Sequence, residues 1–492
     1  MNSAPEKNPV AYSDDTSVLD YVRPSHWTNP RQDEAYDLVV IGAGPAGIAA
    51  AERAVELGAS VALIERHWLG GNSLNVGSVP SKALIHTASL CANLREAANF
   101  FAPVERRPVV DFAAVVSRLQ NLRAHIAEYH SVERLTHAGV HVYFGQAQFL
   151  DEQTLGVDAA RIAFRKALVA TGARPRPSDI AGLDDTGYRT STDIFDLDAL
   201  PRSLAVIGGG PLGCELAQAF CRLGTSVTII QNDPKFLPRE ARDAAEILSR
   251  SMAQDGVQIR LNTTVVGSRV NNGVKTLDLR NDDRASTLET DEILLSIGRI
   301  ANVADLALDR CAVACKDDVG IVVDDFLCST NPRIYAAGDV CMSHKFTHVA
   351  KFTAIMATEN ALLGARRSQR DLIMSWCTFC APEVAHVGMQ VWDAKEQDIP
   401  VKTYTVLMHD VDRAIIDAQE TGFVKIHVRD GSDRILGATI VASRASEMIN
   451  EITVAMKAGI GLRELAAVLH IYPSQAEAMH MAALACVRSQ PE

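Results

Sequence analysis

Two glycine-rich runs have the spacing that suits a dinucleotide pyrophosphate. They are Gly42-Ala43-Gly44-Pro45-Ala46-Gly47 and Gly208-Gly209-Gly210-Pro211-Leu212-Gly213. In such a run the first glycine permits a tight turn, the second lets the pyrophosphate approach the backbone, and the third lets helix and strand pack closely. The helix that begins in the run also points its free N–H groups at the phosphates. The sequence therefore predicts two dinucleotide sites.

The residue that ends the following strand differs between the two runs. Glu65 stands 23 residues after Gly42, where a carboxylate accepts the ribose hydroxyls of an adenine dinucleotide. The second run has Gln231 at that place, so the charge that would repel a 2′-phosphate is missing. Lys235 or Arg239 could face such a phosphate, or could be ordinary solvated loop charges. The pattern favours NADPH over NADH at the second site.

The elements around these runs predict the fold class. Apolar strand, glycine turn, Ala-rich helix and second apolar strand follow one another from Tyr36 and again from Ser203, which is the βαβ pattern of a doubly wound domain. From about residue 371, β-rich stretches precede Ala-rich helices, which indicates a closing α+β domain. We predict an α/β protein divided into an extension (1–35), a first nucleotide-binding domain (36–171 and 295–370), a second one (172–294) and a C-terminal domain (371–492).

Composition excludes several classes of protein. The chain has 492 residues, enough for about three domains, and a net charge of −12, which disfavours non-specific binding to nucleic acid or to an anionic membrane. It has no apolar run of about 20 residues and no secretory signal pattern at its start. Ten cysteines are too dilute for a disulfide scaffold, so we expect reduced thiols and a cytoplasmic location. We expect residues 1–35 to form an irregular surface extension.

Further short motifs complete the pattern. Between and after the glycine runs they are Pro80-Ser81-Lys82, Ala170-Thr171-Gly172, Gly298-Arg299, Tyr335-Ala336-Ala337-Gly338-Asp339 and Tyr472-Pro473 with Glu477. From about Tyr36 to Cys486 their order resembles the class I pyridine nucleotide–disulfide oxidoreductases, and in particular the mercuric-reductase-like and dihydrolipoamide-dehydrogenase-like flavoproteins. That resemblance implies FAD at the first site, NAD(P)H at the second, and a homodimer formed through the C-terminal domain.

The resemblance also implies roles for single residues. Thr171, Gly172 and Gly298 would border the cofactors, and Asp339 would hold the flavin ribityl chain. The helix after Phe346-Thr347-His348 would point its N-terminus at the flavin pyrimidine. Lys82 and Glu215 would pair beside flavin N5, where hydride arrives. Tyr472 and Glu477 would reach the active site from the partner subunit, with Tyr472 in a place that disulfide reductases give to histidine.

One segment departs from the family pattern. The family carries its redox-active cysteines at the positions of Ser73 and Ser78. A serine hydroxyl forms no disulfide and is no soft thiolate, so a dithiol relay is chemically absent there. Sequence alone leaves open whether these serines are natural or engineered. Cys377 and Cys380 form a CxxC further on, which we interpret as structural rather than redox-active.

These features predict an FAD-dependent NAD(P)H oxidoreductase without a redox disulfide. Electrons would pass directly from reduced flavin to a small acceptor, with a quinone or another electrophile as the first candidate, on the face lined by Ser73, Ser78, Tyr472 and Glu477. A transhydrogenase-like enzyme is an alternative, because it needs only the nicotinamide side. A non-catalytic redox sensor or scaffold is a third possibility, which the retained Lys82 and Glu215 argue against.

Overall fold

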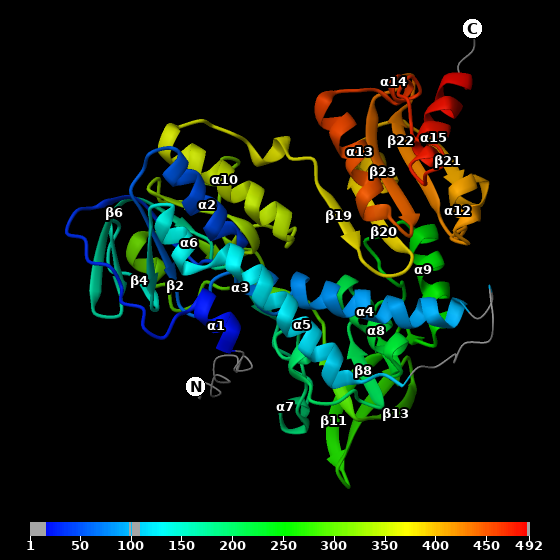
Figure 1. The fold of residues 1–492 in the computed structure, drawn as a ribbon, viewed down its shortest axis with the longest axis horizontal. Coiled ribbons are helices and arrows are strands. Elements are labelled where there is room, and N and C mark those ends of the chain that lie inside the picture. Colours follow the sequence, from blue (N-terminus) through cyan, green and yellow to red (C-terminus); the bar gives the residue numbers. More distant parts are fainter. Residues whose placement is uncertain (1–15, 98–99, 101–108, 490–492) are drawn as a thin grey trace.

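The computed structural model describes residues 16–97, 100 and 109–489, and these form three parts, each built around its own sheet (Figure 1). The α/β class and the C-terminal α+β part that the sequence predicted are both present. Within these described ranges, no helix is both long enough and apolar enough to cross a bilayer.

The first part is a mainly parallel sheet that begins at β1 (Tyr36–Ile41). β1 lies between β2 and β6, parallel to both, and Leu38, Val39 and Val40 have no exposed surface because both faces of the sheet are covered. The other strands, in sheet order apart from β1 and β18, are β3 (Val140–Phe144), β2 (Val61–Glu65), β6 (Ala160–Val169), β5 (Thr154–Val157) and β4 (Ala147–Phe149), with β18 (Ile334–Ala336) beside β6.

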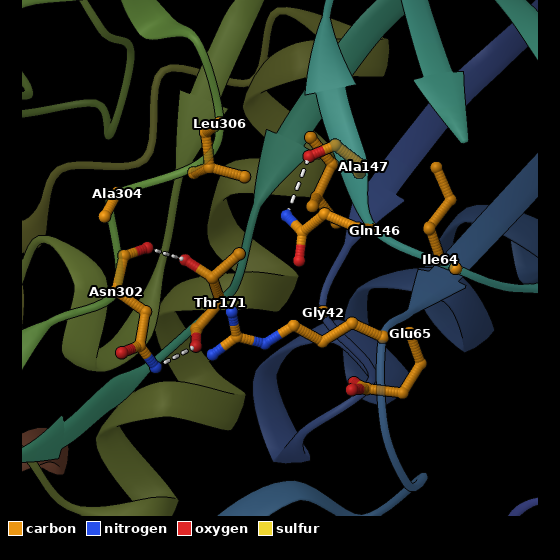
Figure 2. Close-up of a pocket in the computed structure, with 12 residues that line it drawn as sticks. Gly42, Ile64, Glu65, Gln146, Ala147, Thr171, Asn302, Ala304 and Leu306 are labelled. Atoms are coloured by element: carbon orange, nitrogen blue, oxygen red, sulfur yellow. Dashed lines mark hydrogen bonds between the residues drawn. The ribbon is translucent and has the colours of Figure 1, made fainter. Parts of the chain in front are cut away.

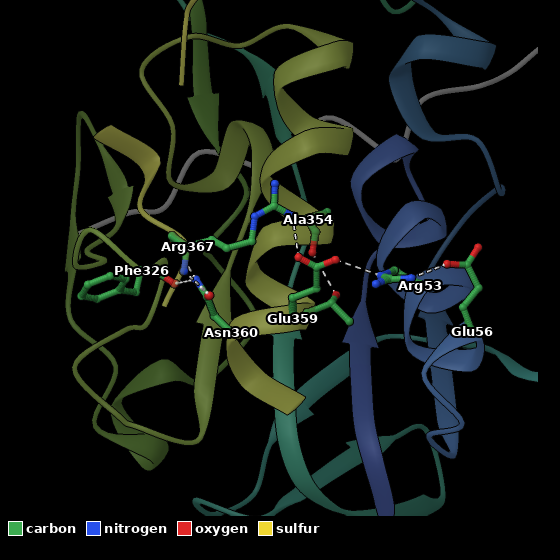
Figure 3. Close-up of polar contacts among 8 residues, drawn as sticks. Arg53, Glu56, Phe326, Ala354, Glu359, Asn360 and Arg367 are labelled. Atoms are coloured by element: carbon green, nitrogen blue, oxygen red, sulfur yellow. Dashed lines mark hydrogen bonds and ion pairs between the residues drawn. The ribbon is translucent and has the colours of Figure 1, made fainter. Parts of the chain in front are cut away.

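Two helices from distant parts of the chain pack side by side on this sheet. They are α2 (Pro45–Glu56), which begins in the first glycine run, and α10 (Thr347–Leu363). Arg53 of α2 pairs with Glu359 of α10 at 3.0 Å, and Arg367 contacts the other oxygen of the same carboxylate (Figure 3). This contact ties the two helices that begin at the candidate cofactor site.

The second part repeats the same local design. Its parallel sheet has the order β10 (Gln258–Arg260), β9 (Ser226–Ile230), β8 (Ser203–Ile207) and β14 (Glu292–Leu295). A meander of β11 (Thr264–Asn271), β12 (Val274–Asn281) and β13 (Arg284–Thr290) adjoins it, together with the helices α8 (Pro211–Leu223) and α9 (Arg242–Asp255). The two chain crossings, β7 (Ala173–Pro175) and β15 (Arg299–Ala301), pair antiparallel, so the two connections between the parts lie side by side.

A long helix of the first part packs against the second part. α4 (Ser78–Ala97) lies beside α5 (Phe112–Ala127) and against α8. Their apolar faces share one core, in which the rings of Phe112 and Phe220 are 6.4 Å apart. α4 begins at Ser78 and contacts α8 one turn later. Ser78 is therefore held near the predicted ion pair of Lys82 on α4 and Glu215 on α8.

The C-terminal part is a five-stranded antiparallel sheet flanked by α13 (Ala445–Ala458), α14 (Leu462–Leu465) and α15 (Glu477–Arg488). In sheet order its strands are β19 (Ser375–Thr378), β20 (Glu383–Gly388), β23 (Ile435–Ala442), β22 (Phe423–Arg429) and β21 (Val401–Leu407). β19 is the edge strand that faces the other two parts, and the residues after it reach the candidate site.

The prediction of an irregular extension is wrong for part of residues 1–35. Residues 16–22 form the helix α1 (Thr16–Val22), and Val18 and Val22 have no exposed surface. The helix forms because these two apolar residues occupy one face at i and i+4 and are buried in the first core. Residues 1–15 lie outside the described part of the chain.

Candidate functional site

The first glycine run forms a tight loop closed by Glu65. The Glu65 carboxylate accepts the N–H of Ala43 at 2.7 Å and that of His67 at 2.8 Å. Burial raises the pKa of Glu65, while the two backbone N–H groups counteract that rise. Gly42 has a φ of +99°, and a side chain there would meet the carbonyl oxygen of Ala170 at 2.6 Å, so only glycine fits.

A cavity opens between this loop and the ends of the neighbouring strands (Figure 2). Thr171 donates its hydroxyl to the carbonyl of Asn302 at 2.7 Å, and the Asn302 amide donates back to the Thr171 carbonyl at 2.9 Å, which fixes one wall. A Cβ built on Gly44 meets nothing nearer than 3.8 Å, so the loop leaves free space beside its backbone. The remaining lining residues are Ile41, Gly42, Ile64, Glu65, Arg66, Gly145, Gln146, Ala147, Ala304 and Leu306. The lining thus brings together Glu65 and Thr171, two of the residues that the sequence predicted to bind the first dinucleotide.

The second glycine run is closed in the same way by an uncharged residue. Gln231 accepts the N–H of Gly209 through Oε1 at 2.8 Å. Gly208 has a φ of +104°, and a Cβ on Gly210 would meet nothing within 4 Å, so this loop too leaves space at its backbone. Lys235 and Arg239 are exposed in the loop that follows. Their side chains are free to turn toward a ligand or to remain in solvent.

Lys82 and Glu215 form an ion pair between the first two parts. Lys82 Nζ is 2.7 Å from Glu215 Oε2, and Glu215 is 4% exposed whereas Lys82 is about a third exposed. The other carboxylate oxygen, Oε1, accepts the backbone N–H of Phe379 at 2.9 Å. The Lys82 ammonium also lies 4.4 Å from the centre of the Phe379 ring. Three parts of the molecule therefore meet at this pair.

Three hydroxyl groups gather at the N-terminus of α10. Thr347 donates its hydroxyl to Ser73 Oγ at 3.2 Å and lies 3.5 Å from Ser78 Oγ. Ser73 belongs to α3 (Gly71–Asn75), and Ser78 begins α4. The two serines are therefore brought to one spot, where the helix N-terminus favours negative charge.

Asp339 follows a tight turn at Gly338, whose φ is +74°. Its carboxylate lies 2.7 Å from Arg299, the residue after Gly298. The Asp339 carbonyl accepts the ammonium of Lys345 at 2.8 Å. Gly298, Gly338 and Asp339 are therefore brought together, although their motifs are about 40 residues apart in the chain.

Tyr472 and Glu477 line one surface hollow of the C-terminal part. Tyr472 is 65% exposed and donates its hydroxyl to Asp412 at 2.8 Å, and this hydrogen bond raises the pKa of Tyr472. Glu477 Oε2 is buried and has no hydrogen-bond partner within the described residues. Neither side chain hydrogen-bonds to Ser73 or Ser78 of its own chain, as far as the described part shows.

All ten cysteines are described, and all are free thiols. Cys377 and Cys380 flank Phe379, so the CxxC lies close to the Lys82–Glu215 pair. Burial raises the pKa of both thiols far above the ordinary value of 9. They are protonated at neutral pH, which is the opposite of a reactive thiolate.

Sequence reasoning missed three residues that the structure places at these sites. Phe379 contacts both members of the Lys82–Glu215 pair, Thr347 joins the two serines, and Arg299 pairs with Asp339. Thr347 and Arg299 stood inside segments that the sequence analysis singled out, so their position was a usable signal for a role. Phe379 had none, because its contact to Glu215 spans 164 positions.

Comparisons with known proteins agree with this arrangement. The family model described as pyridine nucleotide-disulphide oxidoreductase matches residues 36–361, and the dimerisation-domain model of that family matches residues 374–483. The chain is 33% identical to a mercuric reductase from Shigella flexneri (91% of this chain, 80% of that protein) and 31% identical to a dihydrolipoyl dehydrogenase from Chlamydia muridarum (92% and 97%). The solved structure of LpdA from Mycobacterium tuberculosis matches with a TM-score of 0.83 and 28% identity, covering 91% of this chain and 99% of that one.

Proposed function

Because the chain belongs to the pyridine nucleotide-disulphide oxidoreductase family, whose members are NAD(P)H-dependent flavoprotein oxidoreductases, we propose that it passes electrons from reduced flavin directly to a small acceptor. The observation that carries this proposal is the hydroxyl cluster of Ser73, Ser78 and Thr347. It occupies the place where, by resemblance, the family keeps its two redox cysteines. Hydroxyls there supply no disulfide to receive electrons and no thiolate to bind Hg(II).

The chain offers a coherent set of residues to hold FAD. Glu65 and the Gly42–Gly47 loop would hold the adenosine and pyrophosphate, Thr171 and Gly172 would border them, and Asp339 would hold the ribityl chain. When bound, FAD accepts a hydride and gives up two electrons. The N-terminus of α10, with its free N–H groups, would stabilise negative charge on the flavin pyrimidine.

The nicotinamide side depends on the pair of Lys82 and Glu215. Both oxygens of the Glu215 carboxylate are engaged, one by Lys82 Nζ and one by the Phe379 N–H, so its orientation is fixed. The partly exposed Lys82 ammonium would sit beside the flavin where hydride arrives. The uncharged Gln231 leaves room for a 2′-phosphate, which supports NADPH as the preferred donor.

The acceptor side is completed by a second copy of the chain. The dimerisation-domain match supports a homodimer. Tyr472 is exposed and shares a surface hollow with Glu477, whose Oε2 lacks a partner within the described residues of its own chain. In the dimer these two residues would face Ser73 and Ser78 of the other subunit. Tyr472, as a hydroxyl donor, would then supply a proton or a hydrogen bond to the acceptor.

Anaerobic titration with dithionite tests the absence of a flavin-adjacent thiol. We expect the flavin absorbance to bleach fully, without the stable long-wavelength band that a thiolate against oxidised flavin produces. The matched control is the double variant Ser73→Cys with Ser78→Cys, which should gain that band. A stable band in the wild-type protein would show that a thiol does reach the flavin, and the proposal would be wrong.

A panel of acceptors tests which class of molecule takes electrons from the reduced flavin. NADPH consumption should be supported by quinones but not by lipoamide, oxidised glutathione or Hg(II). Turnover of any of these three that alkylation abolishes would assign the reaction to cysteines, with Cys377 and Cys380 as the first candidates.

A further inference from the structure

We infer that residues 22–29 form a strap that positions the adenosine pocket, with Arg23 and Asn29 as positioning residues for the adenosine end of FAD. The inference rests on the proposed FAD site. The strap precedes residue 36, where the match to the family model begins.

Arg23 holds the wall of the pocket that follows Glu65. Its guanidinium Nη1 donates to the carbonyl of Arg66 at 2.8 Å and to that of His67 at 3.0 Å. Arg66 lines the cavity, and the N–H of His67 is one of the two donors that hold the Glu65 carboxylate. The carbonyl of Val22 accepts the N–H of Leu69 at 3.2 Å, so the strap is hydrogen-bonded to both ends of the segment 66–69. Loss of Arg23 would free the turn that orients Glu65.

Asn29 holds the neighbouring strand β3, whose Phe144 is the register partner of Glu65. Its side-chain amide pairs with both backbone groups of Phe144, donating to the carbonyl and accepting the N–H at 2.8 Å each. Trp27 Nε1 adds a bond to the carbonyl of Val142 at 3.2 Å. Phe144 ends β3, the edge strand of the sheet, and the next residue, Gly145, lines the pocket. The strap therefore satisfies edge groups that would otherwise lack a partner strand.

The two contacts act on one structure. The Arg23 guanidinium lies 5.4 Å from the centre of the Phe144 ring. The side chain that binds the Arg66 and His67 carbonyls therefore also packs against β3. The two strand ends are themselves joined, because Gly145 donates its N–H to the Glu65 carbonyl at 2.9 Å. The far end of the strap is anchored by α1, whose Val18 and Val22 are fully buried. The strap is thus anchored by a buried helix and makes hydrogen bonds to the residues that follow Glu65 and to Phe144. This is the arrangement expected of an element that positions the pocket.

The test compares FAD with FMN, which lacks the adenosine half. Deflavinated protein of wild type, Arg23→Ala and Asn29→Ala is titrated with each flavin, and binding is followed by flavin fluorescence. We expect each variant to bind FAD about tenfold more weakly, as one or two lost hydrogen bonds near the ligand would cause. FMN affinity should not change. Asn29→Asp keeps an acceptor for the Phe144 N–H but turns a carboxylate oxygen toward the Phe144 carbonyl, so its loss should be at least as large as that of Asn29→Ala.

Tyr21→Phe is the matched control, because Tyr21 in α1 donates to Glu128 at 2.9 Å and does not contact the pocket. It should leave the FAD-to-FMN affinity ratio at the wild-type value. An unchanged ratio in Arg23→Ala and in both Asn29 variants, or an equal loss for both flavins, would overturn the inference. Wild-type protein that binds no FAD would instead overturn the proposed function. Should Arg23→Ala fail to fold, the FAD-to-FMN affinity ratios of Asn29→Ala and Asn29→Asp provide the test.

Discussion

The two glycine-rich units use the same hydrogen bond but differ in charge. In the first, Glu65 accepts the N–H of Ala43 at 2.7 Å, and in the second, Gln231 accepts the N–H of Gly209 at 2.8 Å. Both acceptors stand at the end of the second strand of their unit. An oxygen atom at that place is therefore needed to close the loop, whichever ligand the loop binds. The charge on it is a separate property, which is left to select the ligand.

The two oxygens differ in the number of N–H groups that surround them. Glu65 has a second N–H donor, from His67, and the strap keeps that turn in place. Gln231 has a single loop N–H as donor. A carboxylate that is 9% exposed needs such donors to remain ionised, because burial alone disfavours its charge. The first unit therefore places a carboxyl group with two N–H donors at this position, and the second a neutral amide.

Removing the first acceptor should have the largest effect. Glu65→Ala leaves two backbone N–H groups without their partner, which costs about 3–4 kcal/mol in total. FAD affinity should fall about 100-fold or more, and Glu65→Gln should lose less, because its amide oxygen can still accept the Ala43 N–H. Titration of the deflavinated variants measures both. Equal affinities for alanine and glutamine variants would refute the role of the loop hydrogen bond.

The second unit carries its own buried carboxylate in the loop after Gln231. Glu240 is 3% exposed and accepts only the indole N–H of Trp376 at 2.8 Å, while its other oxygen has no partner among the described residues. Burial raises the pKa of Glu240 to about 7. Unlike Glu65, this carboxylate lacks a second donor to support its charge.

A raised pKa in the folded state means that the stabilising form is the protonated one. Its contribution is complete below the unfolded pKa of 4.5 and is lost as pH rises through about 7. Compared with Glu240→Gln, the wild-type free energy of unfolding should therefore fall by about 3 kcal/mol between pH 4.5 and pH 8. Urea unfolding of both proteins at several pH values measures this difference. A constant difference across that range would mean that Glu240 does not titrate there.

Breaking the ion pair of Lys82 and Glu215 between the two units should affect the rate of flavin reduction more than the binding of FAD. Glu215→Gln removes one charge of the pair and leaves the Lys82 ammonium without its counter-charge. Flavin reduction by NADPH should slow about 10- to 50-fold in stopped-flow measurements, with FAD content unchanged. A wild-type rate would assign Lys82 and Glu215 a purely structural role.

Giving the second unit the charge of the first should have the smallest effect. Gln231→Glu keeps an acceptor for the Gly209 N–H but places a carboxylate near the 2′ position of the bound nucleotide. The ratio of kcat/KM for NADPH to that for NADH should fall about tenfold, through a weaker interaction with NADPH. An unchanged ratio would place the discrimination elsewhere, with Lys235 and Arg239 the next residues to replace.

The local patterns of the sequence determined the two nucleotide-binding units. Glycine runs, strand periodicity and the strand-ending residues Glu65 and Gln231 act over about 30 positions, and steric and hydrogen-bonding rules at that range are nearly independent of the rest of the chain. The departures at Ser73 and Ser78 were likewise visible at once, because the chemistry of a hydroxyl does not depend on the fold. The same reasoning was wrong for α1, whose stability comes from burial rather than from its own propensity.

Only the tertiary structure decided which groups meet. Phe379 reaches Glu215 across 164 positions, and Thr347 joins Ser73 across 274. Arg23 and Asn29 act on walls that are formed by other parts of the chain. Such contacts depend on how separately formed elements pack, and packing is set by many weak apolar contacts summed over the whole core. No short window of residues contains that sum, so the sequence predicted the groups while the packed structure brought them together.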